Sequence, residues 1–418
     1  MRDGVVFVHA ADLHLDAPFV GISAEDARVG SVLADATYRA FERVIDVCIE
    51  RSADFLVIAG DVYNSADRSL RAQLRFSREM ERLAEAGIGA FVAHGNHDPA
   101  SGWSAGLRLP ETVRVFPTDR VARFEVERDG EVVAAVYGRS FGRAAETDNL
   151  ARGFSRQEGE PVAVAVLHAN VGGQPDHDPY APASLDDLRA ARMDYWALGH
   201  IHKQQELSRD PWAVYPGSPQ GLNPKETGSH GCAVVTVSGG GALDVEYVEC
   251  AAVTWHAIGV DVSSAGSIDD VRRALRDECE RVRREAACAV VARVTLTGRT
   301  PAHAGLARPG VIEDLFGDVR TDLAAETPWL WLDRLADRTR PEIDIDAVRR
   351  GADFASEAVR VADELAADPA ALAALISGIA EPVAATLPGY EPAIDAEELL
   401  ALARDGALDL LLADGEVA

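Results

Sequence analysis

The stretch VAHGNHD (residues 92–98) decides the fold, because it ends a short apolar run in Asn96, His97 and Asp98 instead of an ordinary turn. Four other apolar runs also end in polar residues. Each run is short and rich in Val, Ile, Leu or Ala. The five runs, with the polar residues that end them, are GVVFVHAADLH (Asp12, His14), DFLVIAGD (Asp61), GAFVAHGNHD (Asn96, His97, Asp98), VAVAVLHAN (His168) and DYWALGHIH (His200, His202).

Short apolar runs separated by helical or loop sequence predict strands buried on both faces in a layered α/β fold. In such sheets the strand ends face a common crevice. Asp12 and His14 are two residues apart, as are His200 and His202, so each pair can aim two side chains the same way. The sequence therefore predicts one site built from five distant segments.

The side chains at these ends are those that bind metal ions. Carboxylate, imidazole and amide oxygen together suit divalent cations such as Mn, Fe or Zn, not a thiolate-type structural zinc. Seven candidate ligands exceed the needs of one ion, so we expect two ions bridged by one carboxylate. The candidates are Asp12, His14, Asp61, Asn96, His168, His200 and His202. Isolated histidines are more often structural, and we interpret His9, His94, His177, His230, His256 and His303 in that way.

Composition limits the class of protein. A chain of 418 residues is long enough for two or three domains. No apolar run approaches the ~20 residues of a membrane span, and the first residues do not resemble a signal peptide. Five cysteines without a CxxC motif favour a reducing cytoplasm. The formal net charge of −27 should repel nucleic acid at long range, so a phosphate substrate needs a local reversal of sign.

Composition also changes along the chain, and we place boundaries near Glu249 and Pro341. SGGGALD (residues 238–244) predicts a hairpin turn. Residues 268–286 predict an amphipathic helix, and residues 288–299 predict a strand. From residue 341 to residue 418 there are seventeen Asp or Glu and four Arg, so this region supplies −13 of the net charge.

The blocks D-x-H (12–14), G-D (60–61), G-N-H-D (95–98), His168 and G-H-x-H (199–202) resemble the calcineurin-like metallophosphoesterase superfamily and occur in its order. The stretches FVHAADLHLDAPF, DRSLRAQLRF, LHANVGG and VYPGSPQG are similar to bacterial DNA repair exonucleases of the SbcD/YhaO type, and this similarity extends to about Thr300.

The resemblance implies a four-layer α-β-β-α sandwich (residues 1–249), a small α/β capping domain (250–340) and an acidic helical C-terminal region (341–418). It implies two divalent ions, with Mn²⁺ expected first and Fe²⁺ or Zn²⁺ as alternatives. One ion would take Asp12, His14, Asp61 and His202. The other would take Asp61, Asn96, His168 and His200, so that Asp61 bridges.

Such a site would be positive within a negative protein. The charge of two divalent ions exceeds the combined negative charge of Asp12, Asp61 and a bridging hydroxide, so the pocket would carry a net charge of about +1. Water at such ions loses its proton near neutral pH and becomes the nucleophile. We expect His97 to be the acid for the leaving oxygen or a donor to the phosphoryl oxygens. Asp98 would orient His97 or cap the following helix.

One position departs from the family. Double-strand-break nucleases of this type commonly carry a second catalytic histidine after G-D, and here Asn64 occupies that place. Asparagine can hydrogen-bond a phosphate but cannot transfer a proton. The expected function is a Mn-dependent DNA exonuclease or endonuclease in repair. A phosphodiesterase or phosphatase for nucleotides or other small esters is the alternative, and the intact ligand set disfavours a scaffold without catalysis.

Two further regions have open interpretations. Arg68, Arg71, Arg75, Arg78 and Arg82 lie on one helical face, which we interpret as a solvated face paired with Glu79, Glu81 and Glu85 in preference to a phosphate-binding stripe. The loop Tyr215–Gly228 contacts the substrate backbone or is plain loop. The C-terminal helices pack on their own chain or, as the resemblance to SbcD-type nucleases implies, bind a coiled-coil SbcC-like ATPase. The sequence does not determine the oligomeric state, and a homodimer is one of the states it allows.

Overall fold

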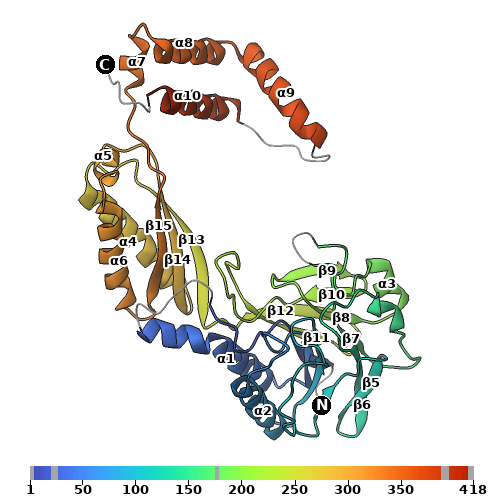
Figure 1. Cartoon of the computed structure of the whole chain (residues 1–418). Coiled ribbons are helices and arrows are strands. Elements are labelled where there is room, and N and C mark those ends of the chain that lie inside the picture. The colour runs from blue at the N-terminus through green and yellow to red at the C-terminus, as the bar shows by residue number, and fades with distance from the viewer. Residues whose placement is uncertain (1–3, 20–26, 175–177, 387–394, 413–418) are drawn as a thin grey trace. The chain divides into compact units, whose positions relative to one another are not determined.

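The computed structural model describes residues 4–19, 27–174, 178–386 and 395–412 (Figure 1). The first sheet has the strand order β12-β11-β1-β2-β3-β4. Strands β1 to β4 run parallel, and β11 pairs antiparallel with β1. The strands are β1 (Val5–Ala10), β2 (Phe55–Ala59), β3 (Gly89–Ala93), β4 (Val113–Val115), β11 (Gly231–Val237) and β12 (Leu243–Glu249). The predicted turn at residues 238–244 is confirmed, since it joins β11 to β12.

The second sheet has the order β5-β6-β7-β8-β10-β9. Strands β6, β7, β8 and β10 run parallel, and the edge strands β5 and β9 run antiparallel to their neighbours. The strands are β5 (Ala122–Arg128), β6 (Glu131–Arg139), β7 (Ala163–His168), β8 (Tyr195–Gly199), β9 (Gln205–Arg209) and β10 (Trp212–Tyr215).

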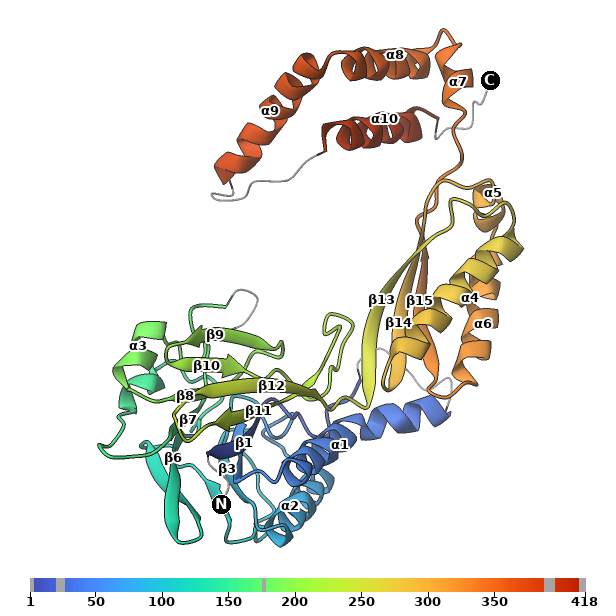
Figure 2. The same ribbon diagram turned by 180° about the vertical axis from the view of Figure 1, so that it is seen from behind.

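Helices cover the outer faces of the two sheets. Helices α1 (Ala27–Glu50) and α2 (Leu70–Glu85) pack on the first sheet, as Figure 2 shows from behind. The second sheet is covered by α3 (Leu185–Ala190) and the 3-10 turn η1 (Leu150–Gly153). Between the sheets lies an apolar core in which the Phe7 ring stacks on Phe55 at 4.9 Å and meets Tyr195 edge-on at 5.2 Å. These layers confirm the predicted α-β-β-α sandwich.

A third, three-stranded sheet follows in the order β13-β14-β15. Its strands are β13 (Val253–Asp261), β14 (Ala289–Thr297) and β15 (Leu330–Asp337), and its helices are α4 (Ile268–Glu285), α5 (His303–Leu306) and α6 (Val311–Ala324). The predicted helix and strand correspond to α4 and β14, so both are confirmed. Trp255, Trp329 and Trp331 contribute to an apolar cluster on this sheet.

The C-terminal region is helical, as predicted: α7 (Ile345–Arg349), α8 (Phe354–Ala367), α9 (Pro369–Thr386) and α10 (Ala396–Leu412). Leu408 of α10 is buried against Ala355 and Val359 of α8. Contacts divide the chain into two compact units, residues 1–258, 278–294 and 316–335, and residues 259–277, 295–315 and 336–418. The three-domain division stays a prediction. Within the described ranges, no helix combines the length and apolarity that a membrane crossing requires.

Candidate metal centre

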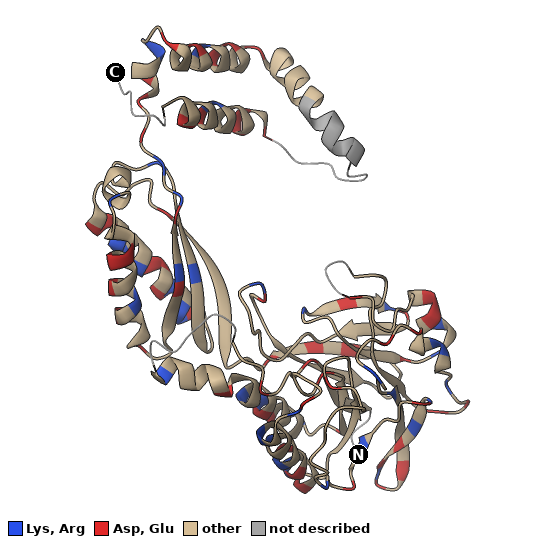
Figure 3. Cartoon of the chain, viewed as in Figure 1, with Lys and Arg blue, Asp and Glu red and all other residues tan. Residues whose placement is uncertain are grey.

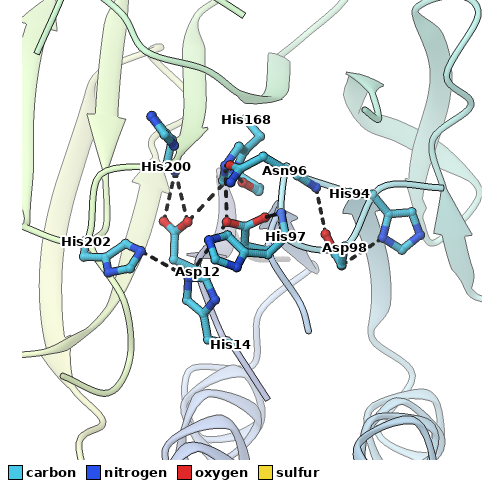
Figure 4. Close-up of polar contacts among 12 residues, drawn as sticks. Asp12, His14, His94, Asn96, His97, Asp98, His168, His200 and His202 are labelled. Atoms are coloured by element: carbon cyan, nitrogen blue, oxygen red, sulfur yellow. Dashed lines mark hydrogen bonds and ion pairs between the residues drawn. The ribbon is translucent and has the colours of Figure 1, made fainter. Parts of the chain in front are cut away.

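The polar residues that end five buried strands meet at one edge of the sandwich (Figure 4). Asp12 and His14 follow β1, and Asp61 follows β2. Asn96 and His97 follow β3, His168 ends β7, and His200 and His202 follow β8. Three groups have ligand atoms within 4.8 Å of one another: Asp12, His14 and His202; Asp12, Asp61 and His168; and His14, Asp61 and His97.

The backbone is strained at four of the predicted ligands. Asp12, His14, Asp61 and His200 have φ angles of 51°, 42°, 50° and 102°, where side chains with a Cβ are disfavoured. Each such residue costs on the order of 1–3 kcal/mol, and such strain concentrates at functional sites. Because of this strained backbone, these four side chains point in directions that residues of a regular strand would not adopt.

Two glycines make room for the site. A Cβ at Gly60 would lie 2.3 Å from Nδ1 of His168, and one at Gly95 would lie 2.3 Å from Oδ1 of Asp61. The glycines of the G-D and G-N-H-D blocks are therefore required because imidazole and carboxylate groups pack directly on the backbone.

His14 and His202 form the first pair of side chains that could bind a metal. Their Nε2 atoms are 3.1 Å apart. Nδ1 of His202 lies 2.9 Å from Oε1 of Glu226, which fixes a proton on Nδ1, so Nε2 is the atom that would bind a metal. Two ligands at about 2.1 Å from one ion and at right angles lie about 3 Å apart, so this pair fits a shared cation.

His168 and Asn96 form the second pair. Nδ1 of His168 donates to the Ala59 carbonyl at 3.0 Å, so Nε2 carries a lone pair. That Nε2 faces Oδ1 of Asn96 at 2.9 Å, and Oδ2 of Asp61 lies 3.5 Å from it. The lone pairs of an imidazole, an amide and a carboxylate converge, and a cation satisfies all three. The donor set therefore fits two metal ions that share Asp61.

His200 lies beside this second pair but outside the three groups of close ligand atoms. Its Nε2 donates to the Asp178 carbonyl at 2.8 Å, which leaves the lone pair on Nδ1. Its backbone N–H donates to both carboxylate oxygens of Asp12 at 3.1 Å. Its role as a ligand stays a prediction, and Nδ1 is the atom that would serve.

His97 stands exposed at the rim of the site. Its ring meets that of His14 edge-on, with centroids 4.8 Å apart. Its Nδ1 donates to the backbone carbonyl of Asn64 at 2.9 Å, and its backbone N–H donates to Oδ1 of Asp61 at 2.9 Å. The Nε2 edge is the one left for a substrate. Asn64 thus orients His97 through its main chain, a contact that sequence alone did not predict.

Asp98 does not orient His97, and that interpretation is corrected. Its fully buried carboxylate accepts hydrogen bonds from the backbone of Gly95 at 2.8 Å and of Val62 at 3.1 Å, and pairs with Nδ1 of His94 at 3.0 Å. Burial opposes its charge, but His94 and these N–H groups outweigh that and lower the pKa of Asp98. Asp98 holds the turn that carries Asn96 and His97.

Burial and mutual charge set the protonation of the metal-free site. Burial raises the pKa of Asp61 to about 7, aided by Asp98, and raises that of Asp12 to about 6. Burial lowers the pKa of His14, and nearby histidines lower it further. Burial opposes a charge on His202, but Glu226 and the aspartates outweigh it and raise its pKa to about 9. Protons thus occupy positions that divalent cations would take.

Glu226 is the polar residue of the site that sequence reasoning missed. Its Oε1 receives Nδ1–H of His202, and its Oε2 accepts the Leu222 backbone N–H at 2.6 Å. It lies in the loop Tyr215–Gly228, for which the sequence suggested substrate contact or plain loop structure but no partner for a histidine. No spacing in the sequence links it to His202, because the two residues meet only in the folded chain.

The arginine face of α2 is mostly paired within the protein. Arg71 pairs with Asp35, Arg75 with Glu42 at 3.0 Å, and Arg82 with Asp46. Arg82 also pairs with Glu79, as expected, but the other partners lie on α1 and not at Glu81 or Glu85. This pattern supports the paired-face interpretation over a phosphate-binding stripe.

The comparisons with known proteins agree with this fold. A calcineurin-like phosphoesterase model matches residues 5–204, and a model of the middle domain of metallophosphoesterase YhaO matches residues 255–340. The chain belongs to the calcineurin-like metallophosphoesterase family, whose members are hydrolases. It is 34% identical to the uncharacterized metallophosphoesterase YhaO of Bacillus subtilis over 346 residues, which cover 82% of this chain and 84% of that one.

More distant relatives have a named role. The chain is 28% identical to the DNA double-strand break repair protein Mre11 of Methanopyrus kandleri over 295 residues, which cover 64% of this chain and 62% of that one. A dimetal phosphatase from Danio rerio is 12% identical, with a TM-score of 0.36, over 59% of this chain and 98% of that one.

Proposed function

We propose that this protein is a Mn-dependent phosphodiesterase that cleaves DNA as an exonuclease or endonuclease in repair, in the cytoplasm. The observation that carries the hydrolytic part is the pair of lone-pair clusters sharing Asp61: His14 with His202, and His168 with Asn96. Relatives named as Mre11 repair proteins support DNA as the substrate. Five free cysteines are consistent with a reducing compartment.

The predicted ligands divide into two sets. Asp12, His14, Asp61 and His202 would hold one ion, and Asp61, Asn96, His168 and His200 the other. Divalent cations at these sets supply charge stabilisation for phosphoryl oxygens and a lowered pKa for water. Mn²⁺ is the expected ion because oxygen and imidazole donors are mixed, which Fe²⁺ and Zn²⁺ also accept.

His97 is the residue we assign to proton donation or phosphoryl binding. The Asn64 carbonyl holds its Nδ1–H, so the ring presents Nε2 to the exposed side of the site. When protonated, Nε2 donates to the leaving oxygen or to a non-bridging oxygen. The hydrogen bond from the His97 backbone N–H to Asp61 fixes the position of His97 relative to the carboxylate that we expect both ions to share.

Hydrolysis of nucleotides or other small esters is the second candidate, and Asn64 is the observation that favours it. Because Asn64 cannot transfer a proton, the site has no second proton donor at this position. It therefore suits a substrate whose leaving group departs without protonation. The test compares a DNA duplex with a bis-aryl phosphate, each with Mn²⁺ and with chelator. Metal-dependent DNA cleavage supports the first candidate, cleavage of the small ester alone supports the second, and neither would contradict both.

We also propose that the C-terminal helices bind a partner, of which a coiled-coil SbcC-like ATPase is the candidate. Leu402 and Leu410 of α10 are 64% and 82% exposed, while Leu408 is buried against α8. Acidic side chains line α8 and α10 (Figure 3), which disfavours DNA as the partner of this region. The helix thus has one face packed on its own chain and another available for helix-in-groove binding. A homodimer remains a further proposal that needs a solution mass.

A further inference from the structure

Helix α10 meets the end of the three-stranded sheet through charged side chains. Nη1 of Arg299 donates to Oδ1 of Asp409 at 2.9 Å, and its Nη2 donates to the Asp405 carbonyl at 3.1 Å. Nε of Arg299 lies 3.5 Å from Oδ2 of Asp405, and Nε of Arg340 lies 3.5 Å from Oδ2 of Asp409. The other oxygen of Asp405 pairs with Arg404 of α10 itself at 2.8 Å. We call Arg299, Arg340, Asp405 and Asp409 the ionic latch.

The two arginines of the latch are held side by side by the backbone. Arg299 follows β14, Arg340 follows β15, and the two residues form an isolated parallel bridge. The backbone N–H of Arg340 donates to the Gly298 carbonyl at 2.9 Å, and that of Thr300 donates to the Arg340 carbonyl at 2.9 Å. Nη1 of Arg299 also donates to the carbonyl of Pro341, at the start of the linker to α7, at 3.1 Å. The strand ends therefore present a preformed pair of cations to α10.

Apolar contacts hold α10 to different elements. Leu408 is buried in a cluster whose other members are Ile343, Ile345, Val348, Ala355, Val359 and Leu412. All of these residues lie beyond the third sheet, in the described part of residues 342–412, which we call the C-terminal arm. Apolar contacts thus join the helices of the arm to one another, while the charged contacts of the latch join the arm to the sheet.

We infer that the ionic latch is a releasable contact that fixes the C-terminal arm in one orientation on the strand ends, and that the arm moves as one body when the latch opens. The latch side chains are 24% to 59% exposed, so salt screens their charges. Screening does not act on the apolar packing of Leu408, which keeps the arm together. A single exposed ion pair contributes little, but a network of charges contributes more.

The latch also decides which way the exposed leucines of α10 face, because α10 contacts the sheet with its acidic side. Asp405 and Asp409 are one helical turn apart and lie on one side of the helix, while Leu402 and Leu410 are exposed. An open latch would let these leucines sample many orientations. The inference needs neither a bound metal nor hydrolysis, so it can be tested apart from the proposed function.

The test is a pair of distances measured on the full chain by double electron–electron resonance. Labels at Ala307→Cys and Leu410→Cys span the latch, and labels at Val361→Cys and Leu410→Cys lie within the arm, all at exposed positions. The background is Cys288→Ser, because the other four cysteines are buried. In low salt we expect one narrow distance for each pair. In about 1 M salt, where charges are screened beyond about 3 Å, we expect the first distribution to broaden and the second to stay narrow.

Exchange of charges identifies the contacts. Arg299→Asp should broaden the first distribution in low salt, because it places a third carboxylate beside those of α10. Adding Asp409→Arg should restore the narrow distance, because it reverses the ion pair. Arg273→Asp, at an exposed arginine whose carboxylate partners lie on its own helix α4, is the matched control and should leave both distances unchanged.

Three outcomes would overturn the inference. A first distance that stays narrow in about 1 M salt would show that other contacts fix the arm, since this salt screens the latch. A first distance that is broad in wild-type protein at low salt would show that no latch forms. A second distance that broadens together with the first would show that the arm does not move as one body. Salt opens the latch without a substitution, so the wild-type comparison decides even where a variant fails to fold.

Discussion

At the scale of the residue, His97 and Asp61 have separable tasks that two substitutions distinguish. His97 donates its Nδ1–H to a carbonyl and touches Asp61 only through its backbone, which alanine retains. We expect His97→Ala to keep both metals, measured by elemental analysis, and to lose about 10²–10³-fold in turnover. Asp61→Ala should lose metals and activity together. Loss of the metals in His97→Ala would instead make His97 a ligand.

Glu226 gives a second prediction at this scale. Its carboxylate fixes the proton of His202 on Nδ1 and so exposes Nε2. Glu226→Gln preserves the shape but not the charge, and we expect Mn²⁺ affinity to fall about 10–100-fold. Calorimetric titration with Mn²⁺ measures this. Glu206→Gln, at a surface glutamate whose partner is Arg209, is the matched control. If Glu226→Gln bound Mn²⁺ as tightly as the wild type, the Glu226 carboxylate would serve only to hold its loop.

The buried aspartates predict how metal-free stability depends on pH. The folded pKa values, about 6 for Asp12 and about 7 for Asp61, lie above the ordinary 3.8. For a raised carboxyl pKa, the folded state holds more protons, so stability falls as pH rises from about 4 to 7. We expect denaturant unfolding to show that Mn²⁺ stabilises the protein more at pH 7 than at pH 5. Equal stabilisation at both values would show that these carboxylates hold no protons in the metal-free fold.

At the scale of the element, the loop between β2 and α2 gives a prediction about Asn64. Its backbone carbonyl orients His97, and a substitution leaves that contact in place. Asn64→His therefore adds only a proton-carrying side chain, and we expect DNA cleavage to rise several-fold at neutral or mildly acidic pH. Asn64→Ala is the control. If the DNA cleavage rate of Asn64→His is unchanged or lower, the Asn64 amide already supplies what this position needs by hydrogen bonding.

Elements that carry their own signal were predictable from sequence. The five buried strands and the polar residues at their ends are a local pattern, and strand ends meet by topology. Partners that meet only after folding were not predictable: Glu226 for His202, His94 for Asp98, and α1 for the arginines of α2. The break between α7 and α8 was not predicted either: the Asp353 carboxylate accepts the backbone N–H of Ser356 and so caps α8 as a separate helix.

At the scale of the whole molecule, the acidic C-terminal helices test the partner proposal. Leu402→Glu with Leu410→Glu changes exposed positions and leaves the buried Leu408 untouched. We expect this double variant to hydrolyse a small phosphodiester normally but to lose binding to a coiled-coil ATPase from the same genome, measured by co-purification. Val132→Glu is the exposed control. Undiminished binding would exclude this face of α10, and lost hydrolysis would show that α10 supports the catalytic fold.

The stacked and edge-on contacts of Phe7, Phe55 and Tyr195 lie between the two sheets, and each sheet supplies some of the predicted ligands. Asp61 follows a strand of one sheet and His168 ends a strand of the other, so the spacing between the two sheets sets the distance between these two side chains. A Cβ at Gly199 would approach the Ala59 carbonyl to 1.8 Å, which leaves no slack at this end of the sandwich. Packing in the interior therefore fixes the geometry of the candidate metal centre, and we expect a substitution in this aromatic layer to change metal affinity without touching a predicted ligand.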